Sequence, residues 1–362
     1  MGRTESVDAL RKRIDQTDEK IVALLNERAA LARQIGRSKH EGKEEVYVPS
    51  REKQILQRIS ALNRGPFSDQ AIRAVYREIL SACRSLEAPV RVAYFGPEAT
   101  FTHMAARKNF GSFASFAPVD TIGAVFQEVV QGRADYGVVP IENSTEGAVA
   151  HTLDMLVEMD TRICAEVFIE VHLFLLSQSG KAEEVRRIVS HPQALAQCRG
   201  WLAAHLPQVA VEEVGSTAQA ARLAAEDAAV AAIASDLARE VYGLSAIAAN
   251  IEDRANNMTR FFVIGRHWAL PSGEDKTSIA CSVKDEVGIL YRMLAPFARA
   301  RINLTKIESR PLKNKPWEYL FFLDFAGHIQ ERKVQRVLKQ LEKSCVFVKV
   351  LGSYPNGLAN GS

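Results

Sequence analysis

The sequence predicts three domains of different classes: an all-α N-terminal domain, a two-lobed α/β domain and an α+β C-terminal domain. In the first 87 residues, apolar side chains recur every three or four positions, which indicates amphipathic helices. From residue 90 short apolar strands alternate with helical stretches, and from residue 276 the order is strand, helix, strand, strand, helix, strand. A chain of 362 residues with 47% hydrophobic content is long enough to bury two to three cores.

The first helix is expected from about Ser6 to His40, a length of roughly 50 Å, which one small domain cannot cover. Pro49 is expected to open a second helix and Ser68 to cap a third. Three helices, one of them overlong, predict an intertwined helical dimer, so the chain is expected to be a homodimer.

Arg28 occupies a position of the first helix where the apolar repeat would place a leucine. A buried unpaired charge is costly, so this face must supply an anion, which is either a structural carboxylate or a ligand. Lys39 follows eleven residues later and lies about 20° from Arg28 around the helix, on the same face. Arg11 lies about 100° away and is expected to face a different neighbour, such as a partner chain.

The α/β region begins after Ala88-Pro89. Its alanine-rich helix at residues 217–226 indicates close helix packing. The expected strands are 90–95, 136–141, 168–176, 185–190, 229–233 and 260–264, with a further helix at 121–131. After the linker at 271–274 the expected elements are strands 277–283, 303–311, 318–325 and 346–352 and helices 289–300 and 331–344.

Composition excludes several classes of function. The net charge is +3 and the charges are interleaved along helices, so nucleic acid is not an expected partner. The five cysteines are scattered and form no C-x-x-C pair, which indicates reduced thiols and a cytoplasmic protein. No apolar run approaches the ~18 residues of a membrane span. The sequence has no metal-ligand spacing and no nucleotide-binding loop, so we expect neither a metal nor a cofactor.

Four short stretches place hydroxyls, amides and a cation at the ends of strands. Each alone is typical of a turn or a helix cap. Together they predict a polar cleft between two α/β lobes, suited to a small carboxylate substrate without a metal. The stretches are Thr100-Phe101-Thr102, P-I-E-N-S at 140–144, Ser190-His191-Pro192-Gln193 with Gln197, and Thr259-Arg260-Phe261 after N-I-E-D at 250–253.

In this order the four stretches resemble the prephenate dehydratase family, and T-R-F after N-I-E-D is its most distinctive string. Residues 276–352 resemble an ACT regulatory domain, and residues 5–87 are similar to the all-helical chorismate mutase domain. The domain order is that of the bifunctional chorismate mutase–prephenate dehydratases. The resemblance predicts domains at 1–88, 90–267 and 275–354, with a periplasmic-binding-protein-like architecture for the second.

The resemblance implies that the anion bound by Arg28 is the substrate chorismate. Chorismate is a dianion, and its rearrangement requires fixed cations and donors but no nucleophile. The resemblance implies that Arg28 and Arg11, the latter from the other protomer, bind the carboxylates, and that Lys39 faces the ether oxygen. Arg51 is expected to bind substrate, and Glu52 to accept a hydrogen bond from the substrate hydroxyl.

The sequence departs from the mutase pattern at two positions. Val48 replaces an Asp that some relatives carry, and Glu87 stands where a Gln is often found beside the ether oxygen. An ionised carboxylate would repel that oxygen. Glu87 is therefore expected to be protonated in the active form.

Prephenate must lose carbon dioxide and a hydroxide, and hydroxide is a poor leaving group, so a donor near that hydroxyl is the central requirement. The resemblance assigns this role to Thr259. Arg260 is expected either to anchor a carboxylate bidentately or to support the loop structurally. The other positions expected to bind or orient substrate are Asn143, Ser144, Ser190 and Gln197.

The resemblance also implies that phenylalanine binds the ACT domain as an allosteric effector. Gly288 lets backbone amides approach the ligand carboxylate at a helix N-terminus, where the helix dipole favours an anion. Val287 departs from the proline often found there, and Ile289 departs from the alanine. The expected effector-binding residues are Gly288, Ile289, Leu290, Glu308, Ser309, Arg310 and Pro311.

The leading hypothesis is therefore a bifunctional enzyme that converts chorismate through prephenate to phenylpyruvate and is inhibited by phenylalanine. One alternative is an arogenate dehydratase with a mutase domain. Another is a non-catalytic amino-acid sensor built on the ACT domain. A pure sensor has no need of Arg11, Arg28, Lys39 and Glu52 in mutase spacing, so the helical domain favours the enzyme.

Overall fold

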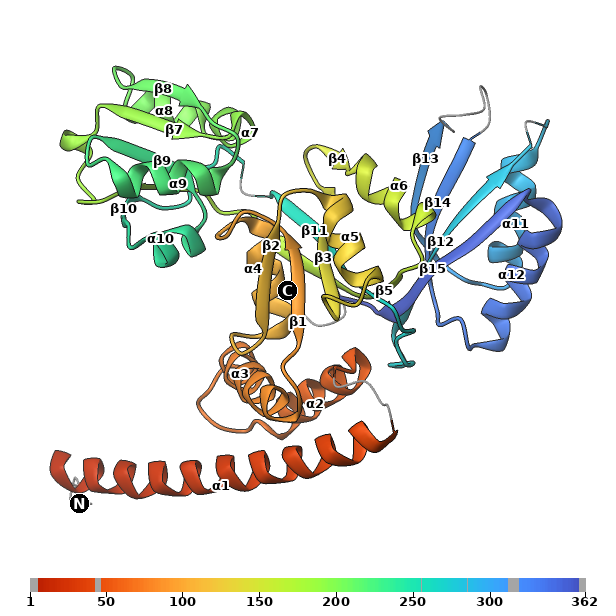
Figure 1. Ribbon diagram of the computed structural model, residues 1–362, viewed down its shortest axis with the longest axis horizontal. Helices are drawn as coiled ribbons and strands as arrows, with labels where there is room; N and C mark the ends of the chain where they lie inside the picture. Colours follow the sequence, from red (N-terminus) through yellow and green to blue (C-terminus); the bar gives the residue numbers. More distant parts are fainter. Residues whose placement is uncertain (1–5, 43–46, 255, 285, 312–318, 358–362) are drawn as a thin grey trace, which may run out of the picture. The chain divides into compact units, whose positions relative to one another are not determined.

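The computed structural model describes residues 6–42, 47–254, 256–284, 286–311 and 319–357, without the side chains of residues 39–42. The chain divides into two compact units. The first comprises residues 1–48, 54–90 and 110–115, and the second comprises the remaining residues. Figure 1 labels the elements of both units.

The first unit is helical, as predicted. It contains α1 (Val7–Gly42), most of α2 (Pro49–Leu62) and α3 (Asp69–Glu87). The Ser68 hydroxyl caps α3 by accepting from the Ala71 amide at 3.1 Å. The first helix packs against α3 near its own C-terminal end, where Ala32 and Gly36 are buried.

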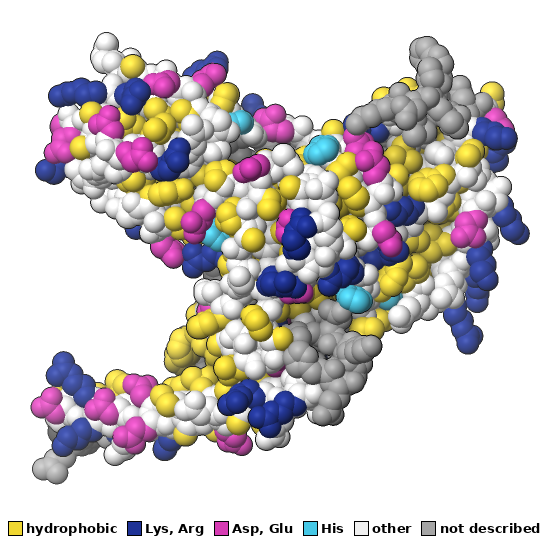
Figure 2. Space-filling model, in the orientation of Figure 1, with side chains coloured by type: hydrophobic (Ala, Val, Ile, Leu, Met, Phe, Trp, Pro, Cys, Tyr) yellow, Lys and Arg dark blue, Asp and Glu magenta, His cyan; other side chains and the backbone are white. Residues whose placement is uncertain are grey.

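Most of the apolar face of α1 is exposed to solvent in the described part of this unit. Its seam residues are each at least 44% exposed, and Figure 2 shows hydrophobic side chains along this helix. These seam residues are Leu10, Ile14, Ile21, Leu24, Leu31 and Ile35. No helix in the described part of the chain is long and apolar enough to cross a membrane.

The second unit holds two α/β lobes and a C-terminal module. Lobe A comprises strands β1 (Arg91–Phe95), β2 (Ser115–Val119), β3 (Tyr136–Asn143), β4 (Gly147–Ala148), β5 (Arg162–Glu170) and β11 (Met258–Gly265), with helices α4 (Phe101–Phe110), α5 (Ile122–Val130) and α6 (Ala150–Glu158). Its strand order is β5-β11-β3-β1-β2, with β4 paired to β3.

Lobe B has a five-stranded sheet of order β10-β6-β9-β7-β8. Its strands are β6 (Phe174–Ser177), β7 (Arg187–Ser190), β8 (Ala210–Glu213), β9 (Val230–Ala234) and β10 (Ser245–Ala248). Its helices are α7 (Pro192–Gln197), α8 (Arg199–His205), α9 (Thr217–Glu226) and α10 (Asp236–Tyr242), besides the short 3-10 helix Ala182–Glu184. Fully buried alanines of α9 pack on the sheet, as the alanine-rich stretch predicts.

One predicted strand is wrong. Residues 168–176 are not a single strand, because β5 ends at Glu170 in one sheet and β6 begins at Phe174 in the other. The backbone between them is held by a distant side chain, since the Glu252 carboxylate accepts from the Leu173 amide at 2.9 Å. An apolar run alone carries no sign of this contact.

The C-terminal module has the predicted βαββαβ order. Its elements are β12 (Asp275–Val283), α11 (Ile289–Arg299), β13 (Leu304–Pro311), β14 (Tyr319–Ala326), α12 (Arg332–Ser344) and β15 (Phe347–Pro355). Helices α11 and α12 lie together on one face of the module's sheet (Figure 1), over a core that includes Phe297, Leu323 and Val337.

The opposite face of the module's sheet packs into the core of lobe A. There Leu320, Phe322 and Tyr354 join Leu156 and Phe262. Strand β15 pairs with β5, so one sheet runs from β13 through the module and across lobe A to β2. The module and lobe A therefore share both a sheet and a hydrophobic core.

Candidate functional sites

Thr259 and Asn143 lie opposite each other on the paired strands β11 and β3. The Asn143 Nδ2 amide donates to Thr259 Oγ1 at 2.8 Å. The Asn143 Oδ1 oxygen accepts from the amides of Thr145 at 2.9 Å and Glu146 at 3.1 Å, which fixes the orientation of this side chain. Because the threonine oxygen accepts a hydrogen bond from the Asn143 amide, the hydroxyl hydrogen of Thr259 can be donated to a substrate.

A chain of amides continues from this pair to lobe B. Asn143 Nδ2 also donates to Asn257 Oδ1 at 2.8 Å, and Asn257 Nδ2 donates to Gln197 Oε1 at 3.1 Å. The Gln197 Nε2 atom is buried and has no hydrogen-bond partner among the described residues. A buried donor left unpaired costs about 1–3 kcal/mol, so this atom is available to pair with water or a polar ligand.

Asn257 was not predicted from the sequence, although it lies two residues before Thr259 and is only 6% exposed. The available signal was the pair of asparagines at 256–257 directly before T-R-F. The buried amide at Asn257 is the link that joins Gln197 of α7 to the strands of lobe A.

The two predicted serines use their hydroxyls within the protein. Ser144 Oγ accepts from the Met258 amide at 3.0 Å and donates to the Asn256 carbonyl at 3.2 Å, which ties the end of β3 to the start of β11. Ser190 is fully buried and donates to the Ile233 carbonyl at 2.6 Å, which ties β7 to β9. These bonds give both serines structural roles, and their contacts with substrate stay a prediction.

The guanidinium of Arg260 is turned away from the Thr259 hydroxyl, because successive side chains of a strand point to opposite faces. It is buried at the junction with the C-terminal module, where its Nε donates to Glu166 at 2.8 Å, Nη1 to Asp324 at 2.6 Å and Nη2 to the Tyr354 hydroxyl at 3.1 Å. These contacts favour the structural alternative for Arg260, and its contact with a substrate carboxylate stays a prediction.

Two further contacts complete this junction. Lys276 Nζ lies 2.9 Å from Glu166 Oε1, and the Ser278 hydroxyl donates to Asp324 at 2.6 Å. Burial raises the pKa of Tyr354 well above its ordinary value, so this side chain is a neutral phenol. We call this set, with Arg260, Glu166, Asp324 and Tyr354, the junction network.

The stretch at 100–102 begins α4. The Thr100 hydroxyl donates to the Pro97 carbonyl at 3.0 Å, and Thr102 is buried. His103 follows, stacked on Tyr94 at a centroid distance of 4.7 Å. Burial lowers the pKa of His103 to about 4, so the ring is neutral at physiological pH.

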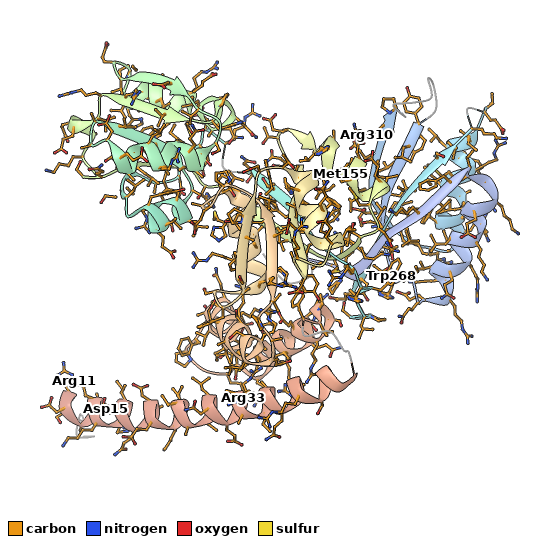
Figure 3. The ribbon with its side chains drawn as sticks, viewed as in Figure 1. Arg11, Asp15, Arg33, Met155, Trp268 and Arg310 are labelled. Carbon is orange, nitrogen blue, oxygen red and sulfur yellow. The ribbon has the colours of Figure 1, made fainter. Side chains whose placement is uncertain are left out.

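In the first unit, Arg28 is half-buried on α1 and forms no ion pair with any residue that the structure describes. Glu87 ends α3 where α1 approaches closely, because a Cβ on Gly36 would lie 3.0 Å from Glu87 Cα. Arg11 is exposed near the start of α1 and pairs weakly with Asp8 at 3.7 Å (Figure 3). Lys39 lies on α1, but its side chain is outside the described residues.

Arg51 and Glu52 belong to the second unit by their backbone contacts. Both lie in the first turn of α2, where Arg51 is exposed and Glu52 is partly buried.

The C-terminal module contains a pocket of about 550 Å³ at the start of α11. Gly288, which precedes this helix, has φ of +76°, a conformation that L side chains rarely adopt. The lining includes four of the seven predicted effector residues, which are Gly288, Ile289, Leu290 and Ser309. The remaining lining residues are Val283, Lys284, Glu286, Tyr319 and Phe321.

The other three predicted effector residues are not among those lining this pocket. Glu308 pairs across strands with Phe322, on the face that packs against lobe A. Arg310 Nη1 donates to Asp154 at 2.7 Å and to the Ala150 carbonyl, both on α6, and Figure 3 shows its side chain near Met155 of that helix. Pro311 ends β13 and is exposed.

Three family models match the chain: chorismate mutase type II over residues 10–88, prephenate dehydratase over residues 92–269 and ACT domain over residues 277–343. The chain is 50% identical over 358 residues to the bifunctional chorismate mutase/prephenate dehydratase of Aquifex aeolicus, which covers 98% of this chain and 99% of that protein.

Two solved structures have a similar fold over about three quarters of the chain. Prephenate dehydratase from Arthrobacter aurescens in complex with L-Phe is 33% identical, with a TM-score of 0.68, and covers 74% of this chain and 90% of its own. A protein described as a novel type of quorum quenching acylase is 30% identical, with a TM-score of 0.69, and covers 75% of this chain and 100% of its own.

Proposed function

Since this chain belongs to the family of bifunctional chorismate mutase/prephenate dehydratases, we propose that it rearranges chorismate to prephenate and then converts prephenate to phenylpyruvate under inhibition by phenylalanine. The observation that carries this proposal is the 50% identity to a bifunctional relative across 98% of the chain, because it spans both motif sets and the regulatory module.

In the dehydratase step, Thr259 donates its hydroxyl proton to the departing hydroxyl of prephenate. The ring carboxylate leaves as carbon dioxide, its bonding electrons enter the ring, and the hydroxyl leaves as water, which makes the ring aromatic. Asn143 supports this role because its Nδ2 amide, 2.8 Å from Thr259 Oγ1, occupies an acceptor site of the hydroxyl and so directs the proton outward. The unpaired Nε2 of Gln197 is the second donor proposed for the substrate.

In the mutase step, Arg28 binds a carboxylate of chorismate, a role supported by the absence of an ion pair to any described residue. Lys39 and Glu87 face the ether oxygen. Arg51 binds substrate, and Glu52 accepts a hydrogen bond from the substrate hydroxyl, as the resemblance implies. These groups hold the reactive conformer and stabilise the charge that develops as the C–O bond breaks.

The proposed cover for the apolar seam of α1 is a second copy of the chain, which brings Arg11 to its partner's mutase site. Large apolar side chains such as Leu24, 64% exposed, and Ile14, 58% exposed, support this because monomeric proteins rarely leave a continuous apolar stripe in water.

The pocket at the start of α11 is the proposed phenylalanine site. Its volume of about 550 Å³ falls within the range typical of small-ligand pockets. Phe321 and Tyr319 offer an apolar surface for a benzyl side chain, and the backbone at Gly288 approaches the ligand without a Cβ in the way.

The test uses the full chain and two single variants. The wild-type protein, given chorismate, should produce phenylpyruvate. Arg28→Ala should abolish prephenate formation and leave turnover of added prephenate nearly intact, whereas Thr259→Ala should do the reverse, with Thr259→Ser retaining part of the activity. If either folded Ala variant silenced both reactions, the assignment of two separate sites would be wrong. Arogenate offered in parallel with prephenate decides between the two dehydratase substrates.

A further inference from the structure

Strand β13 presents different side chains to the effector pocket and to lobe A. Burial alternates along the strand, as expected for a sheet with unlike faces. Ser309 lines the pocket. Lys306 pairs across strands with Asp324 of the junction network, and Arg310 pairs with Leu320 of the core shared with lobe A.

Lys306 uses its position on the lobe A face to contact β3. Its Nζ lies 2.8 Å from Glu142 Oε2, and the Lys306 side chain is only 12% exposed. Glu142 is the sole carboxylate within 4 Å of this ammonium among the described residues. Its Oε2 also lies 3.9 Å from Arg260 Nη1, at the edge of the junction network. The Glu142 side chain is 38% exposed, so solvent partly screens this pair, but the ammonium of Lys306 has no other carboxylate within reach among the described residues.

Glu142 directly precedes Asn143, whose amide contacts Thr259. The pairing of β3 with β11 is irregular at this point: Arg260 pairs with Glu142, but Phe261 pairs with Pro140, so Ile141 is an extra residue on β3. A bulge of this kind changes the direction of nearby side chains and loosens the ladder. Glu142 and Asn143 are adjacent beside this bulge, so a shift of Glu142 moves the backbone from which the Asn143 side chain projects.

We propose that Lys306 is a positioning residue of the dehydratase site, and that its ion pair with Glu142 transmits occupancy of the effector pocket from β13 to the Asn143–Thr259 pair. The proposal rests on the dehydratase function and phenylalanine pocket proposed above. Ligand contact with Ser309 shifts β13, the shift alters the Lys306–Glu142 distance, and Asn143 moves with its neighbour on the bulged strand. Phenylalanine inhibits by favouring the arrangement in which Thr259 is misdirected.

The experiment compares Lys306→Met, Glu142→Gln, the double variant and Lys306→Arg with wild type, all in the full chain. Lys339→Met is the matched control, because Lys339 lies exposed on α12 of the same module. For each protein we would measure kcat and KM for prephenate, the phenylalanine concentration for half-inhibition, phenylalanine binding by calorimetry, and the thermal midpoint.

Lys306→Met and Glu142→Gln should each lower kcat with KM within about twofold, because neither side chain is proposed to touch substrate. Each should also raise the half-inhibitory phenylalanine concentration at least about fivefold, with the calorimetric affinity unchanged. The double variant should be no worse than the more affected single variant, because both remove the same ion pair. Lys306→Arg should restore part of the inhibition, and Lys339→Met should match wild type.

Wild-type inhibition in folded Lys306→Met or Glu142→Gln overturns the proposal, whatever happens to kcat. Loss of phenylalanine binding also overturns it, because the pocket and not the link would then be damaged. If Lys306→Met does not fold, Glu142→Gln removes the same ion pair from the other strand and decides the question. A wild-type protein that fails to turn over prephenate refutes the proposed function itself, which is a distinguishable result.

Discussion

Substitution of Arg260 by Met separates the structural role of this residue from the substrate contact predicted by the sequence. The guanidinium makes charge-assisted bonds of 2.8 Å to Glu166 and 2.6 Å to Asp324. The Glu166 side chain is fully buried, and that of Asp324 is 8% exposed. Methionine removes the cation that these two carboxylates share, together with the guanidinium that lies 4.7 Å from the centroid of the Phe262 ring.

Removing one partner of a buried ion pair typically costs about 3–5 kcal/mol, because the remaining charge stays buried without compensation. Lys276 still lies 2.9 Å from Glu166, and Ser278 still donates to Asp324. The loss of unfolding free energy should therefore fall near the lower end, about 3 kcal/mol. The matched control is Arg187→Met, which breaks a 2.8 Å pair with Glu212 on the surface and should cost at most about 1 kcal/mol.

The assay is urea-induced unfolding followed by tryptophan fluorescence, with prephenate turnover measured in parallel without urea. We expect Arg260→Met to unfold at a clearly lower urea concentration than Arg187→Met, while the fraction that stays folded keeps KM for prephenate within about twofold of wild type. An Arg260→Met protein as stable as wild type, with KM raised tenfold or more, would show that the guanidinium binds substrate and would refute this argument.

Three other predictions follow from single sites. Glu87→Ala should lower mutase activity while Glu87→Gln, which keeps a donor for the ether oxygen, should retain it; equal activity in the two variants would remove Glu87 from the mechanism. Gly288→Val should abolish both phenylalanine binding heat and inhibition, because φ is +76° there, and a normal response would exclude this pocket. Burial holds the pKa of His103 at about 4, below its ordinary 6.5. The contribution of the neutral His103 ring to the free energy of unfolding is therefore fully present above pH 6.5 and is lost as pH falls toward 4. That loss is up to about 3 kcal/mol, and His103→Phe should reduce the pH dependence of the urea midpoint over this interval.

Much of the fold could be predicted because its signals are local. Ser68 and Pro49 mark helix starts by their own chemistry, and the βαββαβ order of the module follows from alternating periodicity. The break between β5 and β6 could not be predicted. It depends on Glu252, whose carboxylate accepts a hydrogen bond from the amide of Leu173, 79 residues away in the sequence.

The candidate site, like the fold, could be predicted only in part. The sequence singled out Asn143, Gln197 and Thr259, which the structure joins through hydrogen bonds. It could not give the direction of Arg260, because the Asp324 carboxylate that accepts from it lies 64 residues further on. Asn257 was missed because an amide in a loop has many local uses, and only the folded chain shows what it bridges.

In three motifs, adjacent residues contact different parts of the molecule: T-R-F at 259–261, P-I-E-N-S at 140–144 and E-S-R-P at 308–311. The two-residue period of a strand explains this difference. Neighbouring residues of a strand face opposite sides, so a run of consecutive polar residues cannot converge on one ligand. Thr259 meets Asn143 while Arg260 enters the junction network, and Glu142 meets Lys306 while Asn143 meets Thr259. Ser309 lines the pocket while Arg310 holds Asp154 of α6. Each motif therefore contributes one residue to a proposed ligand site and the next residue to the contact between lobe A and the C-terminal module. Point substitutions at adjacent positions of one motif should consequently differ in kind, with one changing chemistry or ligand binding and its neighbour changing stability or coupling.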